Sequence, residues 1–217
     1  MTRRGILLAI LLAPLAALAH DPTAQVVQAK EAAPGFVDWI LLGVEHIFTG
    51  YDHLLFLAGV ALVATRIGDL ARAITAFTLA HSITLGLAAF GIVSIPAAIV
   101  EPAIAASIVF VAVENVARRD PQRGRAGLTF AFGLIHGFGF ASVLAEQGIA
   151  QGGAATALAG FNLGVEAGQL AIVGAALLPL VWMRRQGWFG RFALPGSSAA
   201  IGFFGAYWLV ERVLGAP

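Results

Sequence analysis

Apolar residues fill most of the chain in long segments that short polar breaks separate. After a polar stretch that ends at Pro34, these segments cover 36–65, 72–94, 96–117, 126–147, 157–183 and 195–214. A helix needs about 20 apolar residues to cross a bilayer. The pattern therefore predicts an all-α polytopic membrane protein with about six transmembrane helices.

The first residues show a different pattern. Arg3 and Arg4 precede an apolar run from Gly5 to Leu18, which is short for a span, and Ala17-Leu18-Ala19 fits a small-x-small cleavage site. This arrangement is typical of a secretory signal peptide, although an uncleaved first anchor is the alternative. With cleavage after Ala19, the chain divides into a signal peptide (1–19), an external tail (20–35) and a transmembrane domain (36–217).

Cleavage would also make His20 the new N-terminus. Its α-amine and its imidazole could together chelate Cu²⁺ or Ni²⁺, with Asp21 nearby. An ordinary disordered tail is the alternative, because termini often lack structure.

Positive charge is concentrated in alternate breaks. Nine of the eleven Lys and Arg residues beyond the signal peptide lie within 66–72, 118–125 and 184–191, and none lies in the breaks near Ser94 and Gly152. Loops rich in Lys and Arg face the cytoplasm. We therefore predict a multi-pass protein of the cytoplasmic (inner) membrane whose N-terminus and C-terminus are both external, or periplasmic.

Composition supports a membrane protein and excludes several chemistries. Apolar residues make up 59% of the chain and charged residues 12%, against about 25% charged residues in soluble domains. The absence of cysteine excludes disulfides, thiolate metal sites and iron–sulfur clusters. The net charge of +1 gives no indication of nucleic-acid binding, so the expected partners are the lipid bilayer and a small ligand.

The first apolar segment contains a concentration of ionisable groups. The stretch G-V-E-H-I-F-T-G-Y-D-H-L-L-F-L places Glu45, His46, Asp52 and His53 close together, with Gly50 between the two histidines. An unbroken helix would put the two histidines on one face because they are seven residues apart. We favour a broken span, in which Gly50 lets the two histidines fold toward each other.

Two later parts of the chain resemble each other. Residues 76–81 read A-F-T-L-A-H and residues 131–136 read A-F-G-L-I-H, and the following spans contain Val100-Glu101 and Val165-Glu166. This pattern suggests a parallel repeat of spans two and three as spans four and five, a form that transporters use. Chance similarity between apolar segments is the alternative.

The distances along the chain predict one site. His81 lies nine residues from Arg72 and His136 eleven from Arg125, so at about 1.5 Å per residue both lie near the middle of the bilayer. Ionisable groups at this depth are costly and indicate function, although each histidine alone could merely hydrogen-bond a neighbouring helix. We expect one metal-binding cavity in the outer half of the membrane, lined by His46, Asp52, His53, His81 and His136. Glu101 and Glu166 are expected to belong to the same site and to lie near its mouth.

Imidazole together with carboxylate suits Ni²⁺, Co²⁺, Zn²⁺ or Cu²⁺. The motifs His46-x5-Asp52-His53-Leu54-Leu55 and His136-Gly137-x-Gly139, with Ser82 after His81, resemble those of the HupE/UreJ family. The resemblance covers roughly 36–215 and is closer to the family's divergent second branch. It implies a small polytopic protein with a cleaved signal peptide that is a nickel or cobalt permease, or an accessory protein of hydrogenase or urease.

The chain departs from the family pattern at two places. Ile47 stands where the pattern has Pro, and Phe138 and Phe140 stand near the place of a further His.

Three functions remain open from the sequence. The leading one is a nickel or cobalt permease. The second is an intramembrane zinc hydrolase in which Ser82 or Glu101 assists proton transfer. The third is a haem protein for electron transfer, with His81 and His136 as axial ligands.

Overall fold

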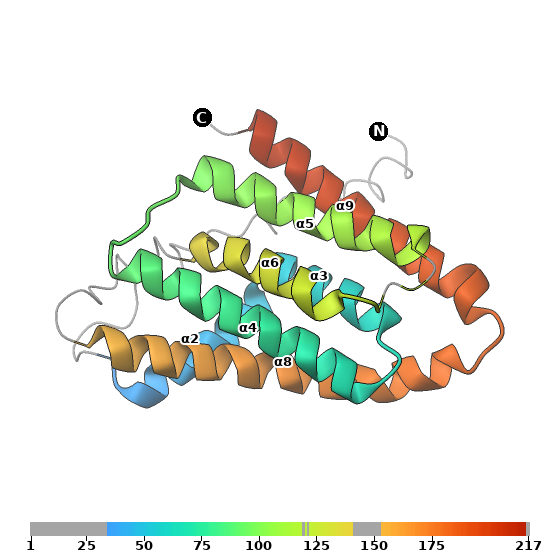
Figure 1. The fold of residues 1–217 in the computed structure, drawn as a ribbon, viewed down its shortest axis with the longest axis horizontal. Coiled ribbons are helices and arrows are strands. Elements are labelled where there is room, and N and C mark those ends of the chain that lie inside the picture. The colour runs from blue at the N-terminus through green and yellow to red at the C-terminus, as the bar shows by residue number, and fades with distance from the viewer. Residues whose placement is uncertain (1–33, 119, 121, 141–152, 216–217) are drawn as a thin grey trace, which may run out of the picture. The chain divides into compact units, whose positions relative to one another are not determined.

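The computed structural model describes residues 34–118, 120, 122–140 and 153–215. The predicted signal peptide, its cleavage site and His20 lie outside these residues. The described part is helical (Figure 1), with these elements: α2 (Phe36–Thr49), α3 (Tyr51–Val63), α4 (Ile67–Ala89), α5 (Ala97–Ala117), α6 (Arg125–Gly139), α8 (Ala154–Arg184), η2 (Phe189–Ala193) and α9 (Leu194–Leu214). The predicted all-α class is confirmed for this part of the chain.

Four helical segments of the described residues are long and apolar enough to cross a membrane: α4, α5, α8, and η2 together with α9. A fifth crossing would be formed by α2 and α3 together, which are bent by 71° at Gly50. The predicted broken first segment is therefore confirmed, and the chain is a multi-pass membrane protein. α6 has 15 described residues, and its predicted range continues into residues that the structure does not describe, so six crossings remain a prediction.

Two helical segments begin at least five residues earlier than the sequence pattern predicted. α4 begins at Ile67 rather than at residue 72, so Arg72 lies within the helix, where its guanidinium is 3.7 Å from the Asp69 carboxylate. Asp69 favours this start because an acidic residue in the first turn interacts well with the helix dipole, and Leu70 is buried in the core. The last helical segment likewise begins at Phe189 rather than at residue 195.

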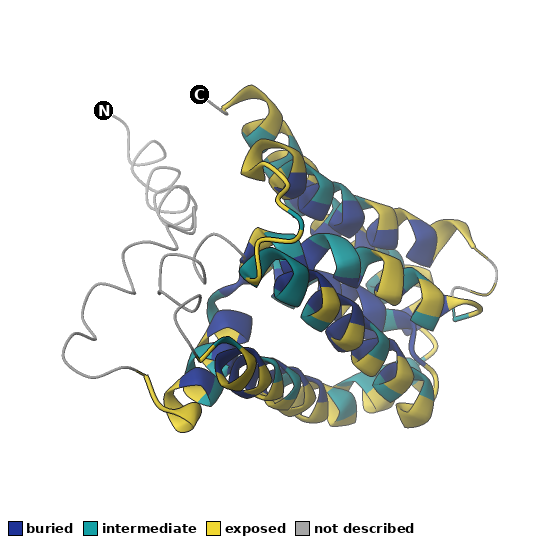
Figure 2. Cartoon of the chain, turned by 60° about the vertical axis from the view of Figure 1, so that its left-hand side comes forward, coloured by how far each residue is buried: buried dark blue, intermediate teal, exposed yellow. Residues whose placement is uncertain are grey.

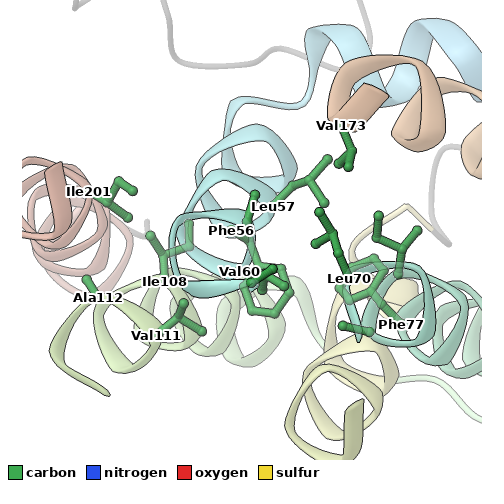
Figure 3. Packing of buried hydrophobic residues seen from close by; sticks show 14 residues of the cluster. Phe56, Leu57, Val60, Leu70, Phe77, Ile108, Val111, Ala112, Val173 and Ile201 are labelled. Atoms are coloured by element: carbon green, nitrogen blue, oxygen red, sulfur yellow. The ribbon is translucent and has the colours of Figure 1, made fainter. Parts of the chain in front are cut away.

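The helices pack mainly in three pairs, α4 with α6, α5 with α9, and α2 with α8. α3 contacts α2, α4, α5, α8 and α9 and therefore occupies the middle of the arrangement. Figure 3 shows side chains of α3, such as Phe56 and Val60, between Ile108 of α5, Phe77 of α4 and Val173 of α8. This central helix begins with Asp52 and His53, so the packing surrounds the predicted site with protein.

Glycines allow the paired helices to approach closely. A Cβ atom on Gly137 of α6 would overlap the carbonyl oxygen of His81, and one on Gly164 of α8 would overlap the carbonyl oxygen of Ile40. Small residues let membrane helices pack backbone against backbone. The glycine at position 137 therefore fixes how near α6 can lie to the turn of α4 that carries His81.

The packing pattern agrees with the predicted repeat. In the predicted repeat α4 corresponds to α6, and α5 corresponds to α8. A contact between α5 and α6 should then have a counterpart between α8 and α4, and both contacts are observed. In the same exchange, the partner of α5, α9, corresponds to the partner of α8, α2. These contacts are the ones that the predicted parallel repeat requires, and the repeat itself remains a prediction.

The outward faces of the helices are exposed (Figure 2). Large apolar side chains lie on these faces of α8 and α9, among them Leu178, Trp182 and Phe203. A soluble protein rarely exposes so much contiguous apolar surface. These faces suit the hydrocarbon of a bilayer, which agrees with the assignment as a membrane protein.

Candidate metal site

The bend at Gly50 brings two histidines of the first segment together. His46 lies in the last turn of α2 and His53 in the first turn of α3, and their ring centroids are 4.7 Å apart. The backbone N–H of Gly50 donates to the His46 carbonyl oxygen at 2.8 Å, which ends α2, and the Gly50 carbonyl accepts from the N–H of Leu54 as α3 begins. The chain therefore turns without losing these two hydrogen bonds, and the turn points both rings to one place.

His81 of α4 completes a group of three. One ligand nitrogen from each of His46, His53 and His81 can be chosen so that all three lie within 4.8 Å of one another. All three side chains are buried, and His81 is fully so. Among the described residues this is the group of His, Asp and Glu side chains with the spacing of a metal site, and we call it the histidine triad.

His136 of α6 lies next to the histidine triad. Its ring centroid is 5.0 Å from that of His53, and its Nε2 is 3.0 Å from the Ser107 hydroxyl of α5. Its Nδ1 is buried without a hydrogen-bond partner among the described residues. The four predicted histidines are thus brought together, three as a compact group and the fourth at its edge.

Aromatic rings enclose the histidines. Phe140 lies 4.3 Å from His46 and stacks on Phe161, with 4.9 Å between the two phenyl rings. On the other side, Phe77 contacts His53, His81 and His136 at centroid distances of 6.1, 6.0 and 5.2 Å. Phe140 is one of the two residues that stand near the place of a further histidine in the family pattern, so an apolar wall covers this side of the triad.

Asp52 lies between the triad and an arginine of the last helix. Its Oδ2 forms an ion pair with Nη2 of Arg212 in α9 at 3.0 Å, whereas its Oδ1 is 4.0 Å from Nδ1 of His53. Arg212 pairs with Asp52 rather than with its neighbour Glu211, because adjacent residues on a helix do not face each other. The role of Asp52 as a ligand remains a prediction.

The two predicted glutamates lie outside the triad. Glu101, in the first turns of α5, is 54% exposed, and its carboxylate is 3.9 Å from Nε of Arg212. Its place near the mouth of the site remains a prediction. Glu166 is half-buried on α8 and forms no hydrogen bond or ion pair within the described part of the chain.

Polar side chains that were not predicted as site residues line a small cavity next to His53. A small cavity of about 10 Å³ is lined by His53, Thr129 and Gln169 together with apolar residues, which is about the space that one water needs. Gln169 is buried, and its Oε1 accepts a hydrogen bond from the Thr78 hydroxyl at 2.8 Å. A glutamine in the middle of a mainly apolar helix, three residues after Glu166, was the signal in the sequence that could have identified this position.

Asn162 of α8 lies beside the ring of His81. Its amide nitrogen donates to the Leu158 carbonyl oxygen at 2.9 Å, whereas its Oδ1 is buried and forms no hydrogen bond of normal geometry in the described structure. The carbonyl oxygen is therefore available to orient the imidazole or to contact a ligand held there.

A second buried polar group lies toward the other end of α5. Arg125 donates to Glu114 at 2.9 Å and to the Asn115 side chain at 2.7 Å, and Asn115 donates to the Gly59 carbonyl oxygen at 2.8 Å. Arg118 also pairs with Glu114. Glu114 and Asn115 are both buried, and the buried Arg125 supplies hydrogen bonds to both side chains.

The fold and the site define a helical membrane protein that encloses a buried histidine cluster. The sequence model of the family described as HupE / UreJ protein matches residues 22–212, so the chain belongs to this family. The family is associated with nickel or cobalt transport or with accessory functions, and it implies handling of a transition metal. No curated protein and no solved structure matches the chain at a significant level.

Proposed function

We propose that this protein is a permease for nickel or cobalt ions and that the histidine triad is its transport site. The observation that supports this proposal is the convergence of His46, His53 and His81 from three helices to within 4.8 Å. Buried polar groups without partners are costly in a membrane interior. A bound dication would give the buried nitrogens of His81 an electron-pair acceptor.

The spacing of the triad is compatible with one bound ion. Two nitrogen ligands at about 2.1 Å from one ion can be no more than about 4.2 Å apart. The three ligand nitrogens lie within 4.8 Å of one another, so at most a small side-chain rotation brings them to that spacing.

The donor set favours a borderline transition metal. Imidazole ligands suit Ni²⁺, Co²⁺, Zn²⁺ and Cu²⁺, whereas Mg²⁺ and Ca²⁺ prefer oxygen ligands. The association of the family with nickel or cobalt selects the first two as the expected cargo. His136 is placed to receive the ion from His53, since their rings are 5.0 Å apart.

The small cavity beside His53 is where we propose that the ion leaves the triad. Its lining includes Phe56 and Phe77 together with Ala73 of α4 and Thr129 of α6, and the last two lie in the first half of their helices. These helix beginnings follow the Arg-rich breaks, which we predict to be cytoplasmic. The oxygens of Thr129 and Gln169 are the polar groups of this route, so we assign it as the inward half of the ion pathway.

The two alternatives receive less support. For a zinc hydrolase, Ser82 donates to the Thr78 carbonyl at 2.7 Å and Glu101 interacts with Arg212, so both proposed proton-transfer groups are engaged elsewhere. For a haem protein, Phe77 and His53 both pack against His81 and against His136, and a macrocycle between those two ligands would have to displace them.

The proposal is tested with purified protein in sealed vesicles. We expect uptake of radioactive Ni²⁺ or Co²⁺ that saturates with concentration, and loss of uptake in His81→Ala. The control is Arg191→Gln, which removes an exposed side chain of η2 that is not part of the site. Absence of uptake by folded wild-type protein, with release of product from a peptide or ester substrate instead, would favour the hydrolase.

A further inference from the structure

We propose that Arg212 closes the outer mouth of the transport site and competes with the arriving dication for the carboxylate of Asp52. This inference rests on the proposed permease function and assigns a residue that controls access to its site. Arg212 belongs to the last helix, α9, far in sequence from every histidine of the triad.

All three nitrogens of the Arg212 guanidinium are engaged. Nη2 pairs with Asp52 of α3 at 3.0 Å, Nη1 donates to the backbone carbonyl oxygen of Glu101 in α5 at 3.0 Å, and Nε is 3.9 Å from the Glu101 carboxylate. The guanidinium also lies over the ring of Trp208, 5.8 Å from its centroid. One side chain therefore connects the ends of three helices, and the rigid fork of Arg suits this better than the single ammonium of Lys.

Solvent exposure places this connection between the triad and the exterior. The side chain of Glu101 is 54% exposed, Arg212 and Asp52 are 21% and 20% exposed, and His53 is 8% exposed. Exposure thus falls in the order in which an ion would meet these residues. An ion that approaches from the side of Glu101 reaches the guanidinium before it reaches the histidines.

Asp52 connects Arg212 with the histidine triad. One of its oxygens binds Arg212, and the other is 4.0 Å from Nδ1 of His53. A dication held by His53 would attract the carboxylate and repel the guanidinium. Ion binding therefore opposes the Asp52–Arg212 ion pair. The bound ion shifts the equilibrium from a closed mouth, in which the pair is formed, to an open mouth, in which it is broken.

A purely structural role for Arg212 predicts a different result. If the ion pair only holds α9 against α3 and α5, its removal loosens the site and weakens metal binding. If it competes with the ion, its removal strengthens metal binding. The sign of the change in affinity therefore distinguishes the two roles.

The experiment measures equilibrium binding of Ni²⁺ and Co²⁺ to purified full-length protein by calorimetry, with thermal unfolding as the check on folding. We expect Arg212→Gln to bind about tenfold more tightly than wild type, a change that corresponds to about 1.4 kcal/mol. The matched control is Arg191→Gln, which removes an exposed Arg of η2 that stacks on Phe192, and it should leave the dissociation constant unchanged.

A double-mutant cycle shows whether Arg212 acts through Asp52. In the Asp52→Asn background, Arg212→Gln should no longer change the affinity, because the shared carboxylate charge is gone. If the increase persists in that background, Arg212 repels the ion directly and the competition for Asp52 is refuted. Unchanged or weaker binding in Arg212→Gln alone also refutes it.

A milder variant covers the case in which Arg212→Gln does not fold. Arg212→Lys keeps a cation near Asp52 but loses the forked contacts that hold the guanidinium, among them the hydrogen bond to the Glu101 carbonyl oxygen. It should increase affinity in the same direction by a smaller factor, and an unchanged or weaker affinity refutes the proposal. If folded wild-type protein binds neither metal, the permease function itself fails, which is a result distinct from normal binding with unaffected variants.

Discussion

The imidazole rings of His46 and His53 lie 4.7 Å apart, although they belong to two helices whose axes differ in direction by 71°. The single residue between those helices, Gly50, makes this contact possible. Half of the candidate site is therefore built locally, by the way one helix ends and the next begins. The other half comes from α4 and α6, which pack against each other through glycines.

The first prediction concerns Gly50. A Cβ atom there would lie 2.8 Å from the His46 carbonyl oxygen and 3.0 Å from Nδ1 of His53. We expect Gly50→Ala to displace one of the two rings and to weaken Ni²⁺ binding at least about tenfold, a cost of about 1.4 kcal/mol. The control is Gly86→Ala in α4, where a Cβ atom meets nothing within 4 Å. Equal affinity of the two variants, measured by calorimetry, would contradict the role of the bend.

The second prediction concerns the contact between α4 and α6. In Gly137→Ala the new methyl group would overlap the His81 carbonyl oxygen and the Thr84 hydroxyl. Overpacking of a well-packed interior costs about 1–3 kcal/mol, so we expect a clearly lower midpoint of thermal unfolding in detergent. Gly127→Ala, on the same helix and facing open space, is the control. If both variants unfold at the wild-type temperature, the close approach of α4 and α6 is wrong.

The third prediction separates the pathway from the binding site. Gln169 lines the cavity below His53 but does not belong to the triad. We expect Gln169→Leu to leave the equilibrium affinity for Ni²⁺ unchanged and to slow uptake into vesicles several-fold, because it removes a polar group from the inward route. The same substitution at Gln186, in an Arg-rich break, should change neither quantity. Normal uptake in Gln169→Leu would show that the ion does not pass this residue.

The fourth prediction tests the orientation. The chain has no cysteine, so single-cysteine variants report only their own position. A cysteine at the exposed residue Arg123 should be protected from an impermeant thiol reagent added outside intact cells, and one at Gly153 should react. The opposite result would reverse the predicted topology and place the Asp52–Arg212 ion pair on the cytoplasmic side.

Much of the fold follows from the sequence because a bilayer restricts the choice. Backbone groups in hydrocarbon must be satisfied within the segment, so apolar runs of this length become helices. Gly50 in the middle of a long segment predicted the break correctly. The start of α4 was harder to predict. Asp69 in the first turn and the buried Leu70 extend the helix through residues that the pattern assigned to a break.

The histidines could be grouped from the sequence for a different reason. The depth of a residue along each span follows from residue counts. Imidazoles at similar depth avoid the lipid, so in a small helical protein they are expected to lie close together in its interior. Rotation about each helix axis does not follow from such counts. For that reason it could not be predicted that Ser107 would face His136, or that Phe140 would cover His46.

The role of Arg212 also escaped the sequence analysis, although one signal was present. It is one of the two basic residues beyond the signal peptide that lie outside the Arg-rich breaks. A basic residue on the predicted external side is contrary to the usual charge distribution. That exception points to a specific partner, and the structure identifies the partner as Asp52.

The central claim is that one metal ion binds to the histidine triad, and X-ray absorption spectroscopy of the Ni²⁺-loaded protein tests it most directly. Imidazole ligands give a characteristic multiple-scattering pattern, from which their number per nickel ion can be fitted. We predict at least three imidazoles per ion in the wild-type protein, from His46, His53 and His81, and one fewer in folded His81→Ala. A loaded wild-type protein whose nickel is surrounded by oxygen ligands without imidazole would contradict the claim.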